Sequence, residues 1–224
     1  MVENTQTQED GEGGKWIIMQ RYSLSADLLS QGTLNDRHVN QVLRSLSVVH
    51  ALLSEEFDAV YEEQSRDLVK YDLELMPLRE EDYLPNRYDF AHRWFSSISG
   101  LLMRKDWNIE TKALRRFYKV AGIASNGRMS MGHVNYLLRS VQTVHDMFSE
   151  LYDVPYISKV AELASDDRKI MVMQTDESYL DARYNYCQKW ISALAGLLNR
   201  KGLVAPPKVI KQNEEIGPED SLVE

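Results

Sequence analysis

The sequence contains an internal repeat, and this feature restricts the possible folds more than any other. Residues 38–45, HVNQVLRS, return 95 residues later as residues 133–140, HVNYLLRS. Identical residues continue on both sides of this match, and beyond residue 81 the offset becomes 96. So long a match with one slip predicts a tandem duplication of one structural unit, residues 15–107 and 108–204. We expect the two units to pack about a pseudo-two-fold axis.

Each unit has the pattern of an all-α protein. Apolar residues recur at the three- and four-residue spacing that is typical of helices packed on one face. We expect a first helix over about residues 16–30, and its copy over about residues 109–125. Gly32 and Gly127 follow these stretches, where the left-handed backbone that glycine tolerates commonly ends a helix.

Two further helices are expected in each unit. The second begins near Asn35 in the first unit and near Ser130 in the other, because both residue types cap helix N-termini. We expect it to continue for about seven turns. The third helix follows Pro85 in the first unit and Asp181 in the second.

The remaining segments are less regular. Residues 62–79 and 157–175 fit either a short helix or a short strand. Residues 1–14 and 205–224 are polar, acidic and interrupted by glycine or proline, so we expect flexible acidic tails at both ends.

The composition predicts a cytoplasmic protein without a cofactor. With 26 Lys and Arg against 34 Asp and Glu, the net charge is −8, which argues against general nucleic-acid binding. The one cysteine, Cys187, excludes an intrachain disulfide and fits a reducing compartment. No apolar run reaches the roughly 18 residues of a membrane span, and residues 1–14 lack the features of a signal peptide.

Four polar residues of the second helix recur in both units, while their neighbours differ. On a helical wheel they lie opposite the apolar stripe. This face fits a solvated surface, a set of ion pairs between the units, or a surface that binds a partner. The interaction candidates are Asn40, Arg44, Glu55 and Asp58 in the first unit, and Asn135, Arg139, Glu150 and Asp153 in the second.

The third helix of each unit contains a Ser-x-x-x-Gly sequence, which places two small residues one turn apart. Glycine inside a helix costs about 1 kcal/mol relative to alanine, so its repetition predicts close helix–helix packing. A tryptophan precedes each sequence and is expected to anchor the core. The helix-packing candidates are Trp94, Ser96, Gly100, Trp190, Ser192 and Gly196.

Two Arg–His pairs are also duplicated. Arg44 precedes His50 by the same spacing as Arg139 precedes His145. This spacing resembles the Arg-x(4–6)-His signature of HEPN domains, all-helical modules that pair to form a metal-independent ribonuclease site. The resemblance implies histidine as the acid or base at the 2′-hydroxyl and arginine as the phosphate clamp. It covers seven residues per unit, and Ser45 stands where the family more often has Asn, Asp or His.

A metal site fits the sequence less well. Metal sites in helical bundles use Glu-x-x-His on facing helices, and the nearest approach, Asp89-x-x-His92, becomes Asn185-x-x-Gln188 in the second unit. The duplicated histidines equally fit a structural role, half-buried and hydrogen-bonded to a neighbour.

We therefore predict a non-enzymatic interaction or scaffold protein of an intracellular or viral assembly. Its duplicated faces would bind protein partners or a further copy of the chain. The alternative is a HEPN-like ribonuclease. Nucleic-acid binding is expected only under this alternative. A third class, an acidic mimic of nucleic acid, follows from the net charge alone.

Overall fold

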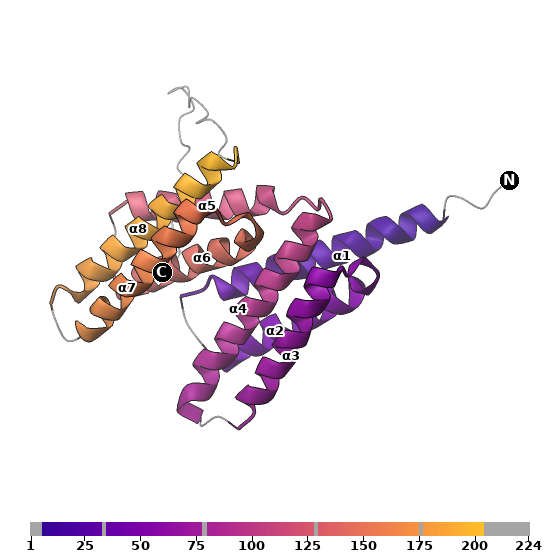
Figure 1. The fold of residues 1–224 in the computed structure, drawn as a ribbon, viewed down its shortest axis with the longest axis horizontal. Coiled ribbons are helices and arrows are strands. Elements are labelled where there is room, and N and C mark those ends of the chain that lie inside the picture. Colours follow the sequence, from indigo (N-terminus) through magenta and orange to yellow (C-terminus); the bar gives the residue numbers. More distant parts are fainter. Residues whose placement is uncertain (1–5, 33–34, 78–79, 128–129, 175–176, 204–224) are drawn as a thin grey trace, which may run out of the picture.

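The computed structural model describes residues 6–32, 35–77, 80–127, 130–174 and 177–203. Within these ranges every regular element is a helix and no strand occurs, which confirms the all-α prediction. The same order of helices occurs twice (Figure 1). Repeat 1 consists of α1 (Gln6–Leu29), α2 (Asp36–Leu52), η1 (Ser54–Glu56), α3 (Ala59–Leu75) and α4 (Glu80–Arg104). Repeat 2 consists of α5 (Glu110–Ser125), α6 (Met131–Met147), η2 (Ser149–Leu151), α7 (Val154–Val172) and α8 (Tyr179–Arg200).

The second helix of each repeat begins where the sequence predicted. The Asn35 side chain accepts a hydrogen bond from a backbone N–H of the first turn of α2, and Ser130 does the same for α6. The predicted length of seven turns is wrong, because α2 and α6 each contain 17 residues. A short 3₁₀ turn follows each of them, and a new helix then begins.

The start of that new helix is fixed by an aspartate. Asp58 accepts a hydrogen bond from the backbone N–H of Tyr61 at the start of α3, and Asp153 caps α7 in the same way. Pro155 stands in the first turn of α7, the position in a helix where a missing N–H is tolerated. Residues 62–79 and 157–175, which fitted helix or strand equally, are helical over most of their length.

Three helices begin earlier than predicted, and for α8 the difference is small: it begins at Tyr179 rather than after Asp181. α1 begins at Gln6, so the expectation of a tail is wrong for residues 6–14, where no proline interrupts the helical hydrogen bonds. α4 begins at Glu80 and contains Pro85 within its first turns. The rest of the predicted tails, residues 1–5 and 205–224, lies outside the described residues.

The two repeats share one hydrophobic core. Its largest buried side chains come from both repeats and include Tyr61 and Tyr156, which occupy equivalent positions. Trp94 and Trp190 are partly buried and pack against this core. The repeats are therefore halves of one folded unit rather than separate domains.

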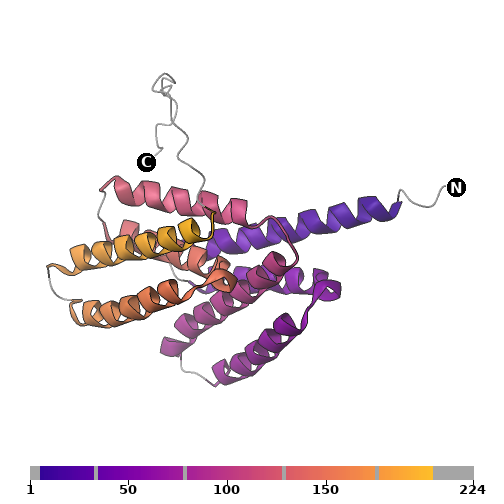
Figure 2. The ribbon, with the colours of Figure 1, turned by 45° about the horizontal axis from the view of Figure 1, so that its top comes forward.

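Corresponding helices of the two repeats run in the same direction. The α7–α8 hairpin lies in nearly the same orientation as the α3–α4 hairpin in both views (Figures 1 and 2). The contacts are also not reciprocal: α4 packs against α6 and η2, whereas α8 and α2 show no contact of similar extent in the described chain. A two-fold axis would make both contacts alike. The predicted pseudo-two-fold axis is therefore wrong, and the repeats pack head to tail.

Candidate functional site

Two of the duplicated polar positions form contacts inside each repeat. Asn40 accepts a hydrogen bond from Arg87 at 3.2 Å, and Asn135 accepts one from Arg183 at 3.3 Å. Each bond ties the second helix of the repeat to its last helix. These asparagines therefore have a structural role.

The duplicated aspartates are also structural. Asp58 receives two hydrogen bonds from Arg104, and Asp153 receives two from Arg200. The guanidinium of Arg200 lowers the pKa of the Asp153 carboxyl to about 2. Because the same carboxylates cap α3 and α7, each fixes the last helix of its repeat to the start of the preceding one.

His50 lies in an aromatic cluster within repeat 1. Its Nδ1 is 2.8 Å from the hydroxyl of Tyr61, and its ring packs against Phe57 and Trp94. Burial lowers the pKa of His50. The imidazole is therefore held in its neutral form at neutral pH.

His145 lies in the equivalent cluster of repeat 2. Its Nδ1 is 2.8 Å from the hydroxyl of Tyr156, and its ring packs against Tyr152 and Trp190. Burial is the main cause that lowers the pKa of His145. Trp94 and Trp190 thus occupy equivalent environments, each edge-on to a histidine.

The four residues of the HEPN-like spacing are not brought into one site. His50 and His145 face the aromatic residues of their own repeats. Arg44 is exposed on α2, while Arg139 lies over the ring of Tyr88, 4.6 Å from its centroid. This geometry gives the histidines a packing role rather than a common acid–base site.

The lowered histidine pKa values predict a pH-dependent stability. Above pH 6.5, the ordinary histidine pKa, both imidazoles are neutral in the folded and in the unfolded chain. Below that pH the unfolded chain takes up protons before the folded chain does. We expect the free energy of unfolding to fall between about pH 7 and about pH 5. Urea unfolding of the wild type and of His50→Gln/His145→Gln at both pH values tests this. The fall should be smaller in the variant, and an equal fall in both proteins would contradict the prediction.

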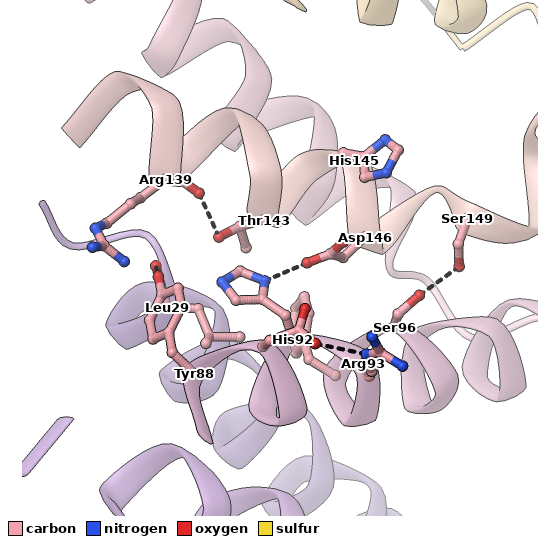
Figure 3. A network of polar contacts seen from close by, with 12 residues as sticks. Leu29, Tyr88, His92, Arg93, Ser96, Arg139, Thr143, His145, Asp146 and Ser149 are labelled. Atoms are coloured by element: carbon pink, nitrogen blue, oxygen red, sulfur yellow. Dashed lines mark hydrogen bonds and ion pairs between the residues drawn. The ribbon is translucent and has the colours of Figure 1, made fainter. Parts of the chain in front are cut away.

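A largely buried histidine–aspartate contact joins the two repeats. Nδ1 of His92 on α4 forms a short contact with the carboxylate of Asp146 on α6, and the two side chains are 3% and 13% exposed (Figure 3). Nε2 of His92 is buried and bonds to no protein group in the described chain. The sequence comparison missed this pair because it occurs once: the equivalent residues are Gln188 and Ala51.

The small-residue face of α4 completes this interface. The hydroxyl of Ser96 donates to that of Ser149 at 2.9 Å, and Nη1 of Arg104 donates to Glu150 at 2.6 Å. A Cβ atom added to Gly100 would lie 2.8 Å from Cγ of Glu150. Gly100 therefore lies under the Glu150 side chain of η2, and the close helix–helix packing predicted at this glycine is not found among the described residues.

Gly196, the counterpart of Gly100, has no such neighbour. A Cβ atom there would meet Nη1 of Arg200 at 3.2 Å and no other group within 4 Å. Gly196, Ser192 and Arg200 instead line an open groove of 480 Å³ between α7 and α8. The predicted close packing is thus absent from repeat 2.

Repeat 1 carries a more apolar groove between α3 and α4, which we call the α3–α4 groove. Its volume is 480 Å³, and it includes the face of His50 that the aromatic cluster leaves open. Val69 and Leu73 on its rim are each 62% exposed. The apolar lining residues are Leu43, Leu68, Val69, Leu73, Phe90 and Trp94.

A third, basic cleft lies between α1 and α5. It has a volume of 330 Å³ and is lined by four cationic side chains of α5, Lys112, Arg115, Arg116 and Lys119, with Asp27 on α1. Lys112 donates to the hydroxyl of Ser23 at 2.6 Å, and burial lowers its pKa.

Other kinds of site are not found in the described residues. They contain no group of three His, Cys, Asp or Glu side chains that could hold a metal ion. None of their helices combines the length and apolar character needed to cross a membrane. No protein-family model, curated protein or solved structure matches the chain.

Proposed function

We propose that the protein is a non-enzymatic interaction or scaffold protein of a larger assembly, and that its α3–α4 groove binds an amphipathic helix of a partner protein. The observation that carries this proposal is the exposed apolar stripe of α3. Val69, Leu73 and Met76 follow one another at helical spacing and are 62%, 62% and 73% exposed. Helix-in-groove recognition uses apolar contacts at this spacing.

The charge of α3 indicates the kind of helix that fits. The exposed surface of α3 as a whole carries five carboxylates, Glu62, Glu63, Asp67, Asp72 and Glu74, against two cations, Arg66 and Lys70. Of these, Asp72 lines the groove itself, together with Arg87 of α4. Opposite charges across an interface favour association and exclude partners of the same charge. We therefore infer that the partner helix has a basic polar face.

The groove of repeat 2 has diverged from this function. Ala164 and Arg168 replace Val69 and Leu73 at the equivalent positions. The duplication therefore supports one apolar docking groove in each chain, rather than the two similar faces that the sequence suggested.

Substitution of Leu73 tests the proposal. A labelled 20-residue helical peptide with leucines at i, i+3, i+4 and i+7 and lysines elsewhere should bind the full chain in a fluorescence-anisotropy titration. Leu73→Asp should weaken binding about 10- to 100-fold, because the burial of one leucine contributes about 1.5–3 kcal/mol.

The design separates apolar from electrostatic binding. Leu73→Asp makes α3 more acidic, so a basic peptide held by charge alone would bind this variant more tightly. Val172→Asp, which adds the same charge at an 85% exposed position of α7, is the matched control. Equal affinities of the three proteins, or a gain with Leu73→Asp, would refute the proposal.

A further inference from the structure

The interface between the repeats is formed by one surface of α6 and one surface of α4. Each surface has an equivalent in the other repeat that makes no such contact in the described chain. Inside the chain, the α6 surface packs on the α4 surface (Figure 3). The α6 surface consists of Arg139, Thr143, Asp146, Ser149 and Glu150, with Met147 at its edge toward α1. The α4 surface consists of Tyr88, His92, Ser96, Gly100 and Arg104. The head-to-tail order leaves the equivalent α2 surface of repeat 1 and α8 surface of repeat 2 without a comparable contact to each other in the described chain.

The α2 surface is apolar and exposed. Val48 and Leu52 are 39% and 46% exposed, whereas their counterparts on α6, Thr143 and Met147, are 0% and 1% exposed. The difference arises because repeat 1 covers α6, while no described part of the chain covers α2 in the same way. Exposed apolar residues at these positions indicate a surface that a further protein covers.

The polar residues of the α2 surface match those that form the internal contact. Arg44, Ser54 and Glu55 are exposed, and they correspond to Arg139, Ser149 and Glu150. In the internal contact, the arginine, serine and glutamate bind a tyrosine ring, a serine and an arginine. The α2 surface carries the same three residue types and could therefore form the same three contacts. No described residue forms a hydrogen bond or ion pair with these three side chains. Contacts inside repeat 1 therefore do not explain why the second repeat has the same residue types.

The α8 surface retains the complementary residues. Tyr184, Ser192, Gly196 and Arg200 correspond to Tyr88, Ser96, Gly100 and Arg104. Figure 1 shows α8 on the side of the bundle that is remote from α2. The open groove beside Gly196 lies where η2 fills the equivalent space in repeat 1.

Arg200 also has a donor available for such a contact. Arg104 directs Nε and Nη2 to Asp58 and Nη1 to Glu150. Arg200 directs Nε and Nη2 to Asp153 in the same way, but its Nη1 has no hydrogen-bond acceptor in the described chain. A glutamate in the position of Glu150 would complete the set.

We propose that a second copy of the chain supplies this glutamate, with the α2 surface of one copy packed on the α8 surface of the next in the geometry of the internal contact. Glu55 of one copy then binds Arg200 of its neighbour, and Ser54 lies against Ser192. Each copy retains a free end, so assembly continues into a ring or a filament rather than stopping at a symmetric dimer. The contact between His92 and Asp146 has no equivalent, since Gln188 would face Ala51, and the contact between copies is therefore weaker than the internal one.

The assembly is tested with the full chain by sedimentation velocity over a range of concentrations. The wild type should form species larger than a dimer as the concentration rises. Gly196→Leu should block the α8 surface and Leu52→Asp/Glu55→Arg the α2 surface, so each variant alone should remain monomeric. A mixture of the two retains one intact pair of surfaces and should form a dimer and nothing larger.

Two controls keep the result specific. Val172→Asp, outside both surfaces, should assemble like the wild type, and circular dichroism should show the same helicity for every variant. A wild type that stays monomeric or stops at a dimer, or variants that still assemble alone, would overturn the proposal. Peptide binding in the α3–α4 groove uses other residues, so Leu73→Asp should assemble normally and the two proposals can fail separately.

Discussion

Replacement of His92 by alanine should lower the free energy of unfolding by about 3–5 kcal/mol, because it leaves the Asp146 carboxylate enclosed without its partner. For a chain of this length each kcal/mol corresponds to about 2–4 °C in Tm. Urea unfolding followed by circular dichroism measures the loss. The measurement should be made at low protein concentration, where the chain is monomeric.

An exposed pair of the same helix provides the control for His92→Ala. Arg93 and Asp89 form an ion pair with side chains 57% and 45% exposed, and Arg93→Ala should cost less than about 1 kcal/mol. The double variant His92→Gln/Asp146→Ala introduces the residue types that occupy the equivalent positions of the other repeat, Gln188 and Ala51. It should be more stable than His92→Ala, since no carboxylate remains buried. Equal losses in His92→Ala and Arg93→Ala would contradict the role of the buried pair.

Replacement of Gly100 by leucine should destabilise the protein by about 1–3 kcal/mol, whereas the same change at Gly196 should be neutral or slightly stabilising. At Gly100 the new side chain would displace Glu150 from Arg104 and separate α4 from η2. At Gly196 the added atoms enter an open groove. Leucine also has a higher helix propensity than glycine, by about 0.8 kcal/mol.

Thermal unfolding of the two glycine variants in parallel makes this comparison internal to the chain. Both substitutions change the same residue type at equivalent positions of related helices. Similar Tm values for the two variants would show that the inter-repeat contact at Gly100 is not tight.

The sequence predicted the features that depend on local chemistry. Asn35 and Ser130 marked helix starts correctly, because a cap acts through the first turn of its own helix. Pro155 marks the break after α6, since proline cannot stand in the middle of a long helix. The expectation of one long helix failed because the apolar stripe continues across the 3₁₀ turn.

The features that depend on packing between repeats could not be predicted in the same way. Comparison of the two copies selects residues that match, and the pair that joins the repeats, His92 and Asp146, has no match. The relative direction of the repeats is also absent from the sequence pattern. A two-fold and a head-to-tail arrangement require the same helices, and they differ only in which faces meet.

The single interface between the repeats has a consequence for the cooperativity of unfolding. In linear repeat proteins the total stability is approximately the sum of each repeat and of the interfaces between neighbours. A strong interface makes the two halves unfold in one transition. Weakening α4 against α6 should therefore broaden or split the transition before it abolishes the helices. The shape of the melting curve, independently of its midpoint, then measures how tightly the two halves are coupled.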